Sequence, residues 1–133
     1  MYLLDTNIIL ELLLDQEQAD QVEQLLRSAP PESFYLSEFA LYSLGVILLR
    51  RKMYDIFLRS VEDLLVTGGI RLARLTMADM RDIIHAAQRF DLDFDDAYQY
   101  VAAEKYGLIL VSLDSDFDRT ERGRKTPAEA LMV

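Results

Sequence analysis

The chain has 133 residues, of which 51% are hydrophobic and 28% are charged, and it contains no cysteine. This composition predicts a single globular domain over residues 1–133, and it excludes a disordered chain, a disulfide scaffold, a thiol nucleophile and cysteine-based metal sites. The net charge of −9 argues against a protein that holds nucleic acid by bulk charge, although it suits an enzyme whose acids surround a metal.

The N-terminal stretch "MYLLDTN" has no basic region ahead of its apolar residues, so we expect no secretory signal. The longest nearly apolar run, at 39–49, has about half of the ~20 residues that a membrane span requires. We therefore expect a cytoplasmic protein with no membrane partner, which also fits the absence of cysteine.

The first third of the chain alternates between strand and helix patterns. A short apolar run at 2–4 predicts a buried strand, and a helical pattern then starts at Ile8 and continues through "DQEQADQVEQLLRS" until "APPES" ends it. A second strand is predicted at 34–36. Ser37 is a suitable N-cap for an almost wholly apolar helix at 39–49, which we expect to be buried.

The alternation continues to the end of the chain. The remaining predicted elements are a helix at 53–65, a half-buried strand at 70–75, a helix capped by Thr76 that reaches Phe90, a helix from "DFDD" to Tyr106 with Gly107 as its C-cap, and a strand at 108–113. The last run is apolar throughout, which is typical of a central parallel strand. Together these elements predict an α/β fold with three α/β/α layers, a central parallel sheet and right-handed crossovers.

Acidic residues follow two of the predicted strands. Asp5 ends the first strand, and Asp114 and Asp116 follow the last one. Sites in open parallel sheets form outside the carboxyl ends of the strands, so Asp96 would join these acids if its helix began at the same edge. Each acid also has an ordinary structural explanation. Asp5 suits a helix N-cap, Asp93 or Asp95 caps the helix that follows, and Asp114 and Asp116 suit a turn.

Carboxylates held close together repel one another unless a cation compensates them. A set of oxygen ligands suits Mg²⁺ or Mn²⁺, and such ions support phosphoryl transfer. A ribonuclease that uses two histidines as acid and base is excluded, because the chain has one histidine. This residue, His85, lies in a helical pattern, where we expect a structural or solvent-facing role. The chain also lacks a glycine-rich phosphate loop, a GxSxG motif and a GxGxxG motif.

Three segments in this order resemble the PIN-domain family: "LLDTN" at the N-terminus, "DFDDAYQYVAAEKYG" in the last third, and "LILVSLDSDF" beyond it. The resemblance covers nearly the whole chain. It implies an α/β/α fold and a Mg²⁺- or Mn²⁺-dependent endoribonuclease whose products carry a 5′-phosphate and a 3′-hydroxyl. Many small members of the family are toxins of toxin–antitoxin pairs, so the resemblance makes an antitoxin protein a candidate partner, although the sequence itself does not show whether the chain is a toxin.

The resemblance assigns roles position by position. Asp5, Asp96 and Asp114 match the family's first, third and fourth acids, and are the expected catalytic and metal-binding residues. Asp116 matches an auxiliary acid, which adds a further expected metal ligand. Polar residues at family positions are expected to bind substrate: Thr6, Asn7 and Ser112.

The family's second acid has no counterpart in the usual register. The family commonly shows a serine, five residues and then Glu-Leu, but six positions after Ser37 this chain has Ser43. Glu38 is the one acid in this segment, roughly 140° around the helix from Ser43 at ~100° per residue. It is either a metal ligand at the rim of the site or a first-turn glutamate favoured by the helix dipole.

The segment "RTERGRK" at 119–125 carries four bases and one acid. We expect its bases to contact substrate phosphate, or alternatively to form a solvated tail or to pair with nearby acids. They are Arg119, Arg122, Arg124 and Lys125. A second basic run, "RRK" at 50–52, is most simply a solvated helix end. The apolar helices at 39–49 and 53–65 leave room for a homodimer.

The leading hypothesis is thus a metal-dependent ribonuclease acting on RNA. A second hypothesis, motivated by Ser43, is a PIN-fold interaction module with weak or no catalysis. A third is a phospho-acceptor receiver domain, which is disfavoured because its acidic pair after the first strand and its late lysine are absent.

Overall fold

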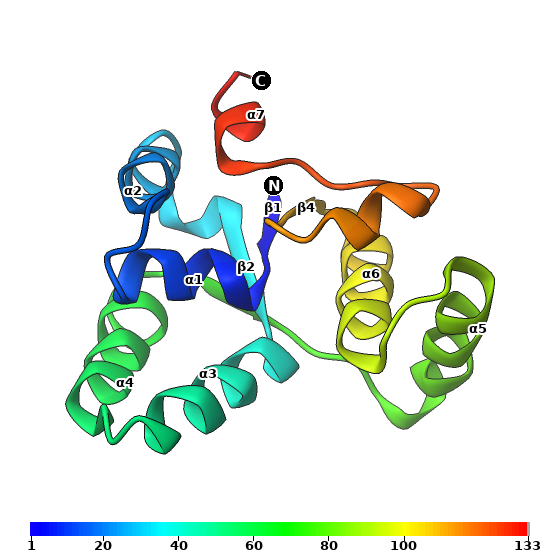
Figure 1. The fold of residues 1–133 in the computed structure, drawn as a ribbon, viewed down its shortest axis with the longest axis horizontal. Coiled ribbons are helices and arrows are strands. Elements are labelled where there is room, and N and C mark those ends of the chain that lie inside the picture. The colour runs from blue at the N-terminus through cyan, green and yellow to red at the C-terminus, as the bar shows by residue number, and fades with distance from the viewer. Residues whose placement is uncertain (133) are drawn as a thin grey trace.

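The computed structural model describes residues 1–132. Within that range, four parallel strands form one sheet in the order β3-β2-β1-β4 (Figure 1). The strands are β1 (Tyr2–Leu4), β2 (Phe34–Ser37), β3 (Arg71–Ala73) and β4 (Ile109–Val111). Parallel strands need long crossovers, and here helices supply them, as the alternating sequence pattern predicts.

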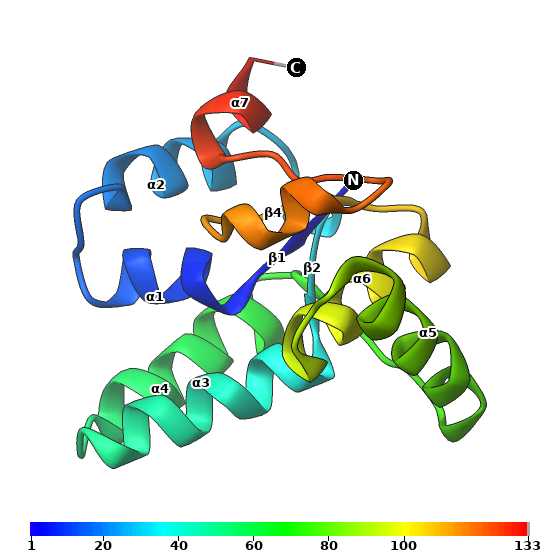
Figure 2. The ribbon, with the colours of Figure 1, turned by 45° about the vertical axis from the view of Figure 1, so that its right-hand side comes forward.

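The α-helices are α1 (Thr6–Leu13), α2 (Ala19–Arg27), α3 (Glu38–Arg50), α4 (Tyr54–Ser60), α5 (Met80–Phe90), α6 (Phe94–Tyr106) and α7 (Pro127–Leu131). Short helical turns add η1 (Pro31–Ser33), η3 (Met77–Asp79) and η4 (Ser115–Arg119), and α4 continues into a π-helical segment, η2 (Val61–Val66). Figures 1 and 2 show α1 to α4 on one side of the sheet and α5 and α6 on the other. The predicted three-layer α/β/α arrangement is confirmed.

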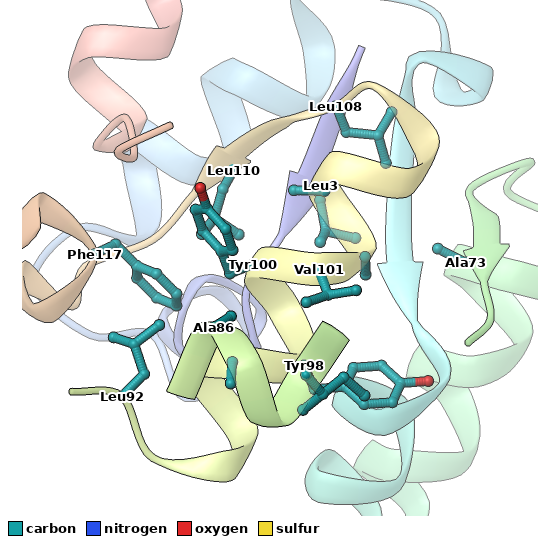
Figure 3. Packing of buried hydrophobic residues seen from close by; sticks show 14 residues of the cluster. Leu3, Ala73, Ala86, Leu92, Tyr98, Tyr100, Val101, Leu108, Leu110 and Phe117 are labelled. Atoms are coloured by element: carbon teal, nitrogen blue, oxygen red, sulfur yellow. The ribbon is translucent and has the colours of Figure 1, made fainter. Parts of the chain in front are cut away.

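Two apolar clusters, one on each face of the sheet, hold the layers together. Leu3 belongs to the cluster with α5 and α6, whereas its neighbour Leu4 belongs to the cluster with α1 and α2. Side chains alternate between the two faces of a strand, so β1 is buried on both sides. Figure 3 shows Val101 of α6 close to Leu3, with Tyr98 further away in the same cluster. The middle of α6 is therefore packed against the sheet.

The sequence pattern predicted one helical stretch from Ile8 to the end of "DQEQADQVEQLLRS", and this prediction is wrong. The helix breaks at Asp15, which has a φ of 48° in the left-handed region that aspartate tolerates better than most residues. The carboxylate of Glu11 then accepts a hydrogen bond of 2.8 Å from the backbone N–H of Gln18, just before α2. The turn lets α2 pack back onto α1.

The strand predicted as central, at 108–113, is β4, and it lies at the edge of the sheet. Its outer side is covered by the backbone of Lys125, whose N–H donates to Leu110 (2.8 Å) and whose carbonyl accepts from Ser112 (3.0 Å). Both faces of β4 are also packed, since Leu110 and Val111 belong to opposite clusters. An edge strand covered in this way has the apolar pattern of a central one, which explains the error.

The helix predicted at 39–49 forms as α3, but the expectation that it is buried holds for one face. Ala40, Leu44 and Leu48 are buried, at the spacing of one helical stripe. Tyr42 is 61% exposed and Val46 is 51% exposed. The outer apolar face of α3 is thus available for contact with another molecule.

The remaining elements form where the sequence predicts them. Thr76 precedes η3 and α5, and its backbone N–H donates to the Asp79 carboxylate at 2.7 Å. Gly107 ends α6 with a φ of 65°, the conformation expected for a glycine C-cap. Within residues 1–132, no helix combines the length and apolar character that crossing a bilayer would need.

A first prediction concerns the start of α3. The Ser37 hydroxyl is buried and accepts a hydrogen bond of 2.9 Å from the N–H of Ala40. We expect Ser37→Ala to lower the free energy of unfolding by about 1 kcal/mol, because the cap is lost. Ser43→Ala, a helix-interior change, is the matched control and should have an effect within about 0.5 kcal/mol. Equal effects of the two changes in urea unfolding would contradict this account of the cap.

Candidate metal centre

Asp5 lies at the carboxyl end of β1, where it also caps α1. Its Oδ1 accepts hydrogen bonds from the N–H of Thr6 (2.8 Å) and from Nε2 of Gln99 (2.9 Å). Its Oδ2 accepts one from Oγ of Ser112 (2.7 Å). Burial raises the pKa of Asp5 above its ordinary value, while these donors oppose the rise. The surrounding residues therefore hold this carboxylate in one orientation. The N-cap role is confirmed, and a role for Asp5 as a metal ligand stays a prediction.

Asn7 and Ser112 join the two strand ends. Nδ2 of Asn7 donates to Oγ of Ser112 (3.3 Å), and Oδ1 of Asn7 accepts from the N–H of Leu113 (3.2 Å). The N–H of Asp114 donates to Oγ of Ser112 (3.0 Å). These polar residues, expected at the sequence level to bind substrate, are thus engaged in fixing the β1 and β4 ends, and contact with substrate stays a prediction.

Three aspartates meet beside Asp5. One carboxylate oxygen from each of Asp96, Asp114 and Asp116 lies within 4.8 Å of the others, a group that stands out among the described residues as able to hold an ion. Asp96 comes from the first turn of α6, and the other two follow β4. The Asp114 side chain accepts from the N–H of Asp116 at 2.9 Å, which holds this turn together. The predicted convergence of distant segments is confirmed for these three acids.

The electrostatics of this group are unfavourable without a cation. Burial, followed by the charge of the neighbouring Asp114, raises the pKa of Asp96 to about 7. Asp5 and Asp95 add smaller repulsive contributions. A divalent ion would relieve the repulsion, and a set of carboxylate oxygens is what Mg²⁺ and Mn²⁺ prefer. The residues present therefore fit such an ion.

Glu38 begins α3 at the carboxyl end of β2, but its carboxylate lies outside the group of three. Its Oε2 forms an ion pair of 3.1 Å with Nε of Arg74, and its Oε1 accepts from the Tyr42 hydroxyl at 3.2 Å. Ser43, where the family's glutamate is expected, lies half-buried further along α3. A role for Glu38 as a ligand stays a prediction.

The bases at 119–125 are also engaged within the protein. Arg119 pairs with Asp116 (2.9 Å) and donates to the carbonyl of Phe90 (3.1 Å). Arg122 donates to the carbonyl of Leu108 at 3.0 Å.

Arg124 pairs with Asp118 (3.1 Å) and donates to the carbonyl of Ser112 (3.0 Å). Lys125 covers β4 through its backbone. The acid-pairing alternative thus has direct support at Arg119 and Arg124.

Sequence reasoning missed Gln99. This residue is 1% exposed, and its Nε2 donates a hydrogen bond to Asp5. Among the described residues, its Oε1 stands out as a buried side-chain atom without a hydrogen-bond partner. Gln99 follows Asp96 by three positions, so the two lie on neighbouring turns of one helix. A polar residue in the otherwise apolar segment that follows Asp96 was the available signal.

The fold and the acids define a class: an α/β/α protein with a carboxylate site at the carboxyl edge of a parallel sheet. A family model described as "PIN domain" matches residues 2–123. The chain belongs to the PIN-domain family, as its motifs predict. In sequence, no curated protein matches the chain.

Several solved structures share the fold of this chain over most of its length. A toxin–antitoxin complex from Klebsiella pneumoniae has a chain that is 21% identical with a TM-score of 0.75, covering 96% of this chain and 98% of its own. VapC20 from Mycobacterium tuberculosis, described as a toxin that cleaves the sarcin–ricin loop, is 20% identical with a TM-score of 0.76, covering 89% and 93%. FitAcB from Neisseria gonorrhoeae is 27% identical with a TM-score of 0.72, covering 96% and 99%. These likenesses support the fold.

The raised pKa of Asp96 predicts a pH-dependent stability. The folded protein keeps a proton on Asp96 up to about pH 7, whereas the ordinary pKa is 3.8. Between these values the folded state binds more protons than the unfolded state, so the free energy of unfolding falls as the pH rises. This contribution is complete below the ordinary pKa and is lost as the pH passes 7.

We therefore expect Asp96→Asn to stabilise the metal-free protein at pH 8 but not at pH 4. After allowance for the partly exposed carboxyl, the gain at pH 8 should be about 1–2 kcal/mol, or about 3–6 °C in the midpoint of thermal unfolding. Asp82→Asn, which removes an exposed acid on α5, is the charge-matched control. An equal gain at both pH values would contradict the assigned cause.

Proposed function

We propose that the chain is a metal-dependent endoribonuclease that hydrolyses RNA phosphodiester bonds. The observation that carries the proposal is the convergence of Asp96, Asp114 and Asp116 at the carboxyl edge of a PIN-domain sheet. Acids gathered in this way repel one another and destabilise the metal-free fold, so a structural role does not explain why they lie together. The proposed products carry a 5′-phosphate and a 3′-hydroxyl.

In this proposal Asp96, Asp114 and Asp116 hold Mg²⁺ or Mn²⁺. When bound, such an ion lowers the pKa of water and stabilises the charge that develops on a reacting phosphate. Asp96 must lose its proton before it can bind the ion, so affinity for the ion should rise as the pH passes 7. Asp5 is proposed as a further ligand of the ion, directly or through water, because its carboxylate lies close enough to repel the charge of Asp96.

Substrate contacts belong to the rim of the site. Thr6 and Asn7 lie next to the acids, and in the proposal they orient the RNA backbone. Ser112 is fully buried, so its proposed part in substrate binding is to hold Asp5 and Asn7 in place. Arg119 neutralises Asp116 in the metal-free protein, and an ion on Asp116 would release this guanidinium for contact with phosphate. Arg122, Arg124 and Lys125 are further proposed phosphate contacts, at the cost of their present contacts with β4.

Glu38 is proposed to reach the ion directly or through a water molecule. It begins a helix at the same edge of the sheet as the aspartates, which supports the proposal. To reach the ion, its carboxylate has to leave Arg74.

We also propose that the chain is a cytoplasmic toxin paired with an antitoxin protein. The similar Klebsiella pneumoniae structure is described as a toxin–antitoxin complex, and VapC20 is described as a toxin. A homodimer is proposed through the outer apolar face of α3, where Val46 and Leu49 are exposed.

A second candidate function is a PIN-fold interaction module with weak or no catalysis. It is favoured by two observations: serine stands at position 43, and the nearby Glu38 is already paired with Arg74. Calorimetric titration separates the two functions. Absence of Mg²⁺ or Mn²⁺ binding at millimolar concentration would favour the interaction module.

The ribonuclease proposal predicts that the protein cleaves single-stranded RNA in the presence of Mn²⁺ and that EDTA abolishes the activity. Asp96→Asn should lower kcat by at least about 100-fold. Mutation of residues that only hydrogen-bond to a metal ligand already lowers activity or metal affinity about 10- to 100-fold, and Asp96 is proposed as a ligand itself. Asp82→Asn should retain full activity, since this exposed acid lies on α5 outside the acid group. Equal cleavage by wild type and Asp96→Asn, with both proteins folded, would contradict the assignment.

A further inference from the structure

A small groove opens between the start of α3 and the start of α6. Its volume is about 240 Å³, and aromatic and methionine side chains form most of its walls. They are Phe39, Tyr42, Met77, Met80, Phe94 and Tyr98. Glu38 also lines the groove, so the groove adjoins the carboxyl edge of the sheet.

Three of the rings form a connected aromatic wall. The centroids of Phe39 and Phe94 lie 5.9 Å apart, and those of Phe39 and Tyr98 lie 5.3 Å apart, both pairs tilted. The Tyr98 hydroxyl accepts from the N–H of Leu75 at 3.3 Å, which fixes this ring from behind. Phe94 is 43% exposed although an apolar core lies beside it. The wall is therefore rigid at Tyr98 and open to solvent at Phe94.

The groove and the acid group both involve the start of α6, although none of the three aspartates lines the groove. Phe94 is the first residue of α6 and precedes Asp96 by two positions, and Phe39 follows Glu38 in the first turn of α3. Both helices start at the carboxyl edge, α3 directly after β2. A polymer with one phosphate at the aspartates can thus extend its neighbouring unit toward the aromatic wall.

Charge and size decide what kind of group the groove can take. The one acid in its lining, Glu38, is paired with Arg74, so the groove has neutral apolar walls with a carboxylate and a guanidinium at the rim. Such walls do not suit a phosphate or a metal ion. The volume is below the ~300–1,000 Å³ of pockets that hold drug-sized ligands, and it is too small for a helix of a protein partner. A single planar, uncharged heterocycle fits both restrictions.

We propose that this groove stacks one unpaired nucleobase of the RNA strand whose phosphate lies at the acid site, an inference that rests on the proposed function. Bases stack on exposed aromatic side chains irrespective of sequence, since every base has a π-face. Arg74, which pairs with Glu38 beside the groove, offers a hydrogen-bond donor to the edge of the base. The groove thereby makes the enzyme select single-stranded RNA, because a base in a duplex is not free to enter it.

The test measures binding without cleavage, in the Asp96→Asn background. The probes are a fluorescein-labelled 12-mer of oligouridylate and a 12-mer of the same charge whose riboses carry no base. We expect Phe94→Ala to weaken binding of the oligouridylate about 5- to 100-fold, from the usual range for one stacked base. Affinity for the abasic probe should not change, and Phe94→Tyr should restore binding of the oligouridylate.

Ile84→Ala is the matched control, because it removes a similarly exposed apolar side chain on α5 outside the groove. It should leave both affinities unchanged. Unchanged affinity of Phe94→Ala for the oligouridylate, or an equal loss for both probes, overturns the proposal. A shift in oligomeric state or in binding of an antitoxin peptide with unchanged RNA affinity overturns it as well, since a protein would then be the occupant.

Cleavage by the wild-type protein distinguishes this proposal from the proposed function. Cleavage with Mn²⁺ together with base-independent binding overturns the groove proposal alone. Base-dependent binding through Phe94 without any cleavage supports the groove and overturns the catalytic assignment.

Discussion

Mutual repulsion among carboxylates at the carboxyl edge of the sheet is the constraint to which the surrounding structure responds. Asp5 is held by hydrogen bonds from Gln99 and Ser112, and Asp116 is held by Arg119. Asp96 has no such relief, and burial with the nearby Asp114 charge raises its pKa to about 7. The folded chain thus keeps an unfavourable group of acids whose natural compensation is a divalent cation.

The rest of the fold serves to bring these acids together. Burial of β1 on both faces places Asp5 in the middle of the sheet edge, and the packing of α6 against β1 brings Asp96 beside it. The 119–125 segment then covers β4 and contacts the acid group through Arg119. Residues proposed to bind substrate therefore also have structural roles here, and the arginines illustrate this overlap.

Much of the fold could be predicted from local patterns. Apolar runs bounded by Asp5 and by Ser37 mark strands that end in helix caps, and both caps form as expected. The acid group could also be predicted, because the carboxyl ends of parallel strands share one edge. The break at Asp15 was missed, since it depends on how α2 packs back onto α1.

Other features depend on tertiary partners that no local pattern specifies. The position of β4 at the edge was missed because the backbone around Lys125 covers it. The partners of Arg122 and Arg124 include backbone carbonyls distant in sequence, and every residue type offers a carbonyl. Gln99 was missed for a related reason, since its meaning depends on its contact with Asp5.

The claim at the centre of this account is that the aspartates hold one divalent ion. A crystal structure of the protein soaked in Mn²⁺, with anomalous scattering to locate the ion, tests it most directly. The account predicts one ion bound by oxygens of Asp96, Asp114 and Asp116 at about 2.1 Å, with Arg119 displaced from Asp116. An ordered site without an anomalous peak, with the Arg119 pair intact, would contradict it.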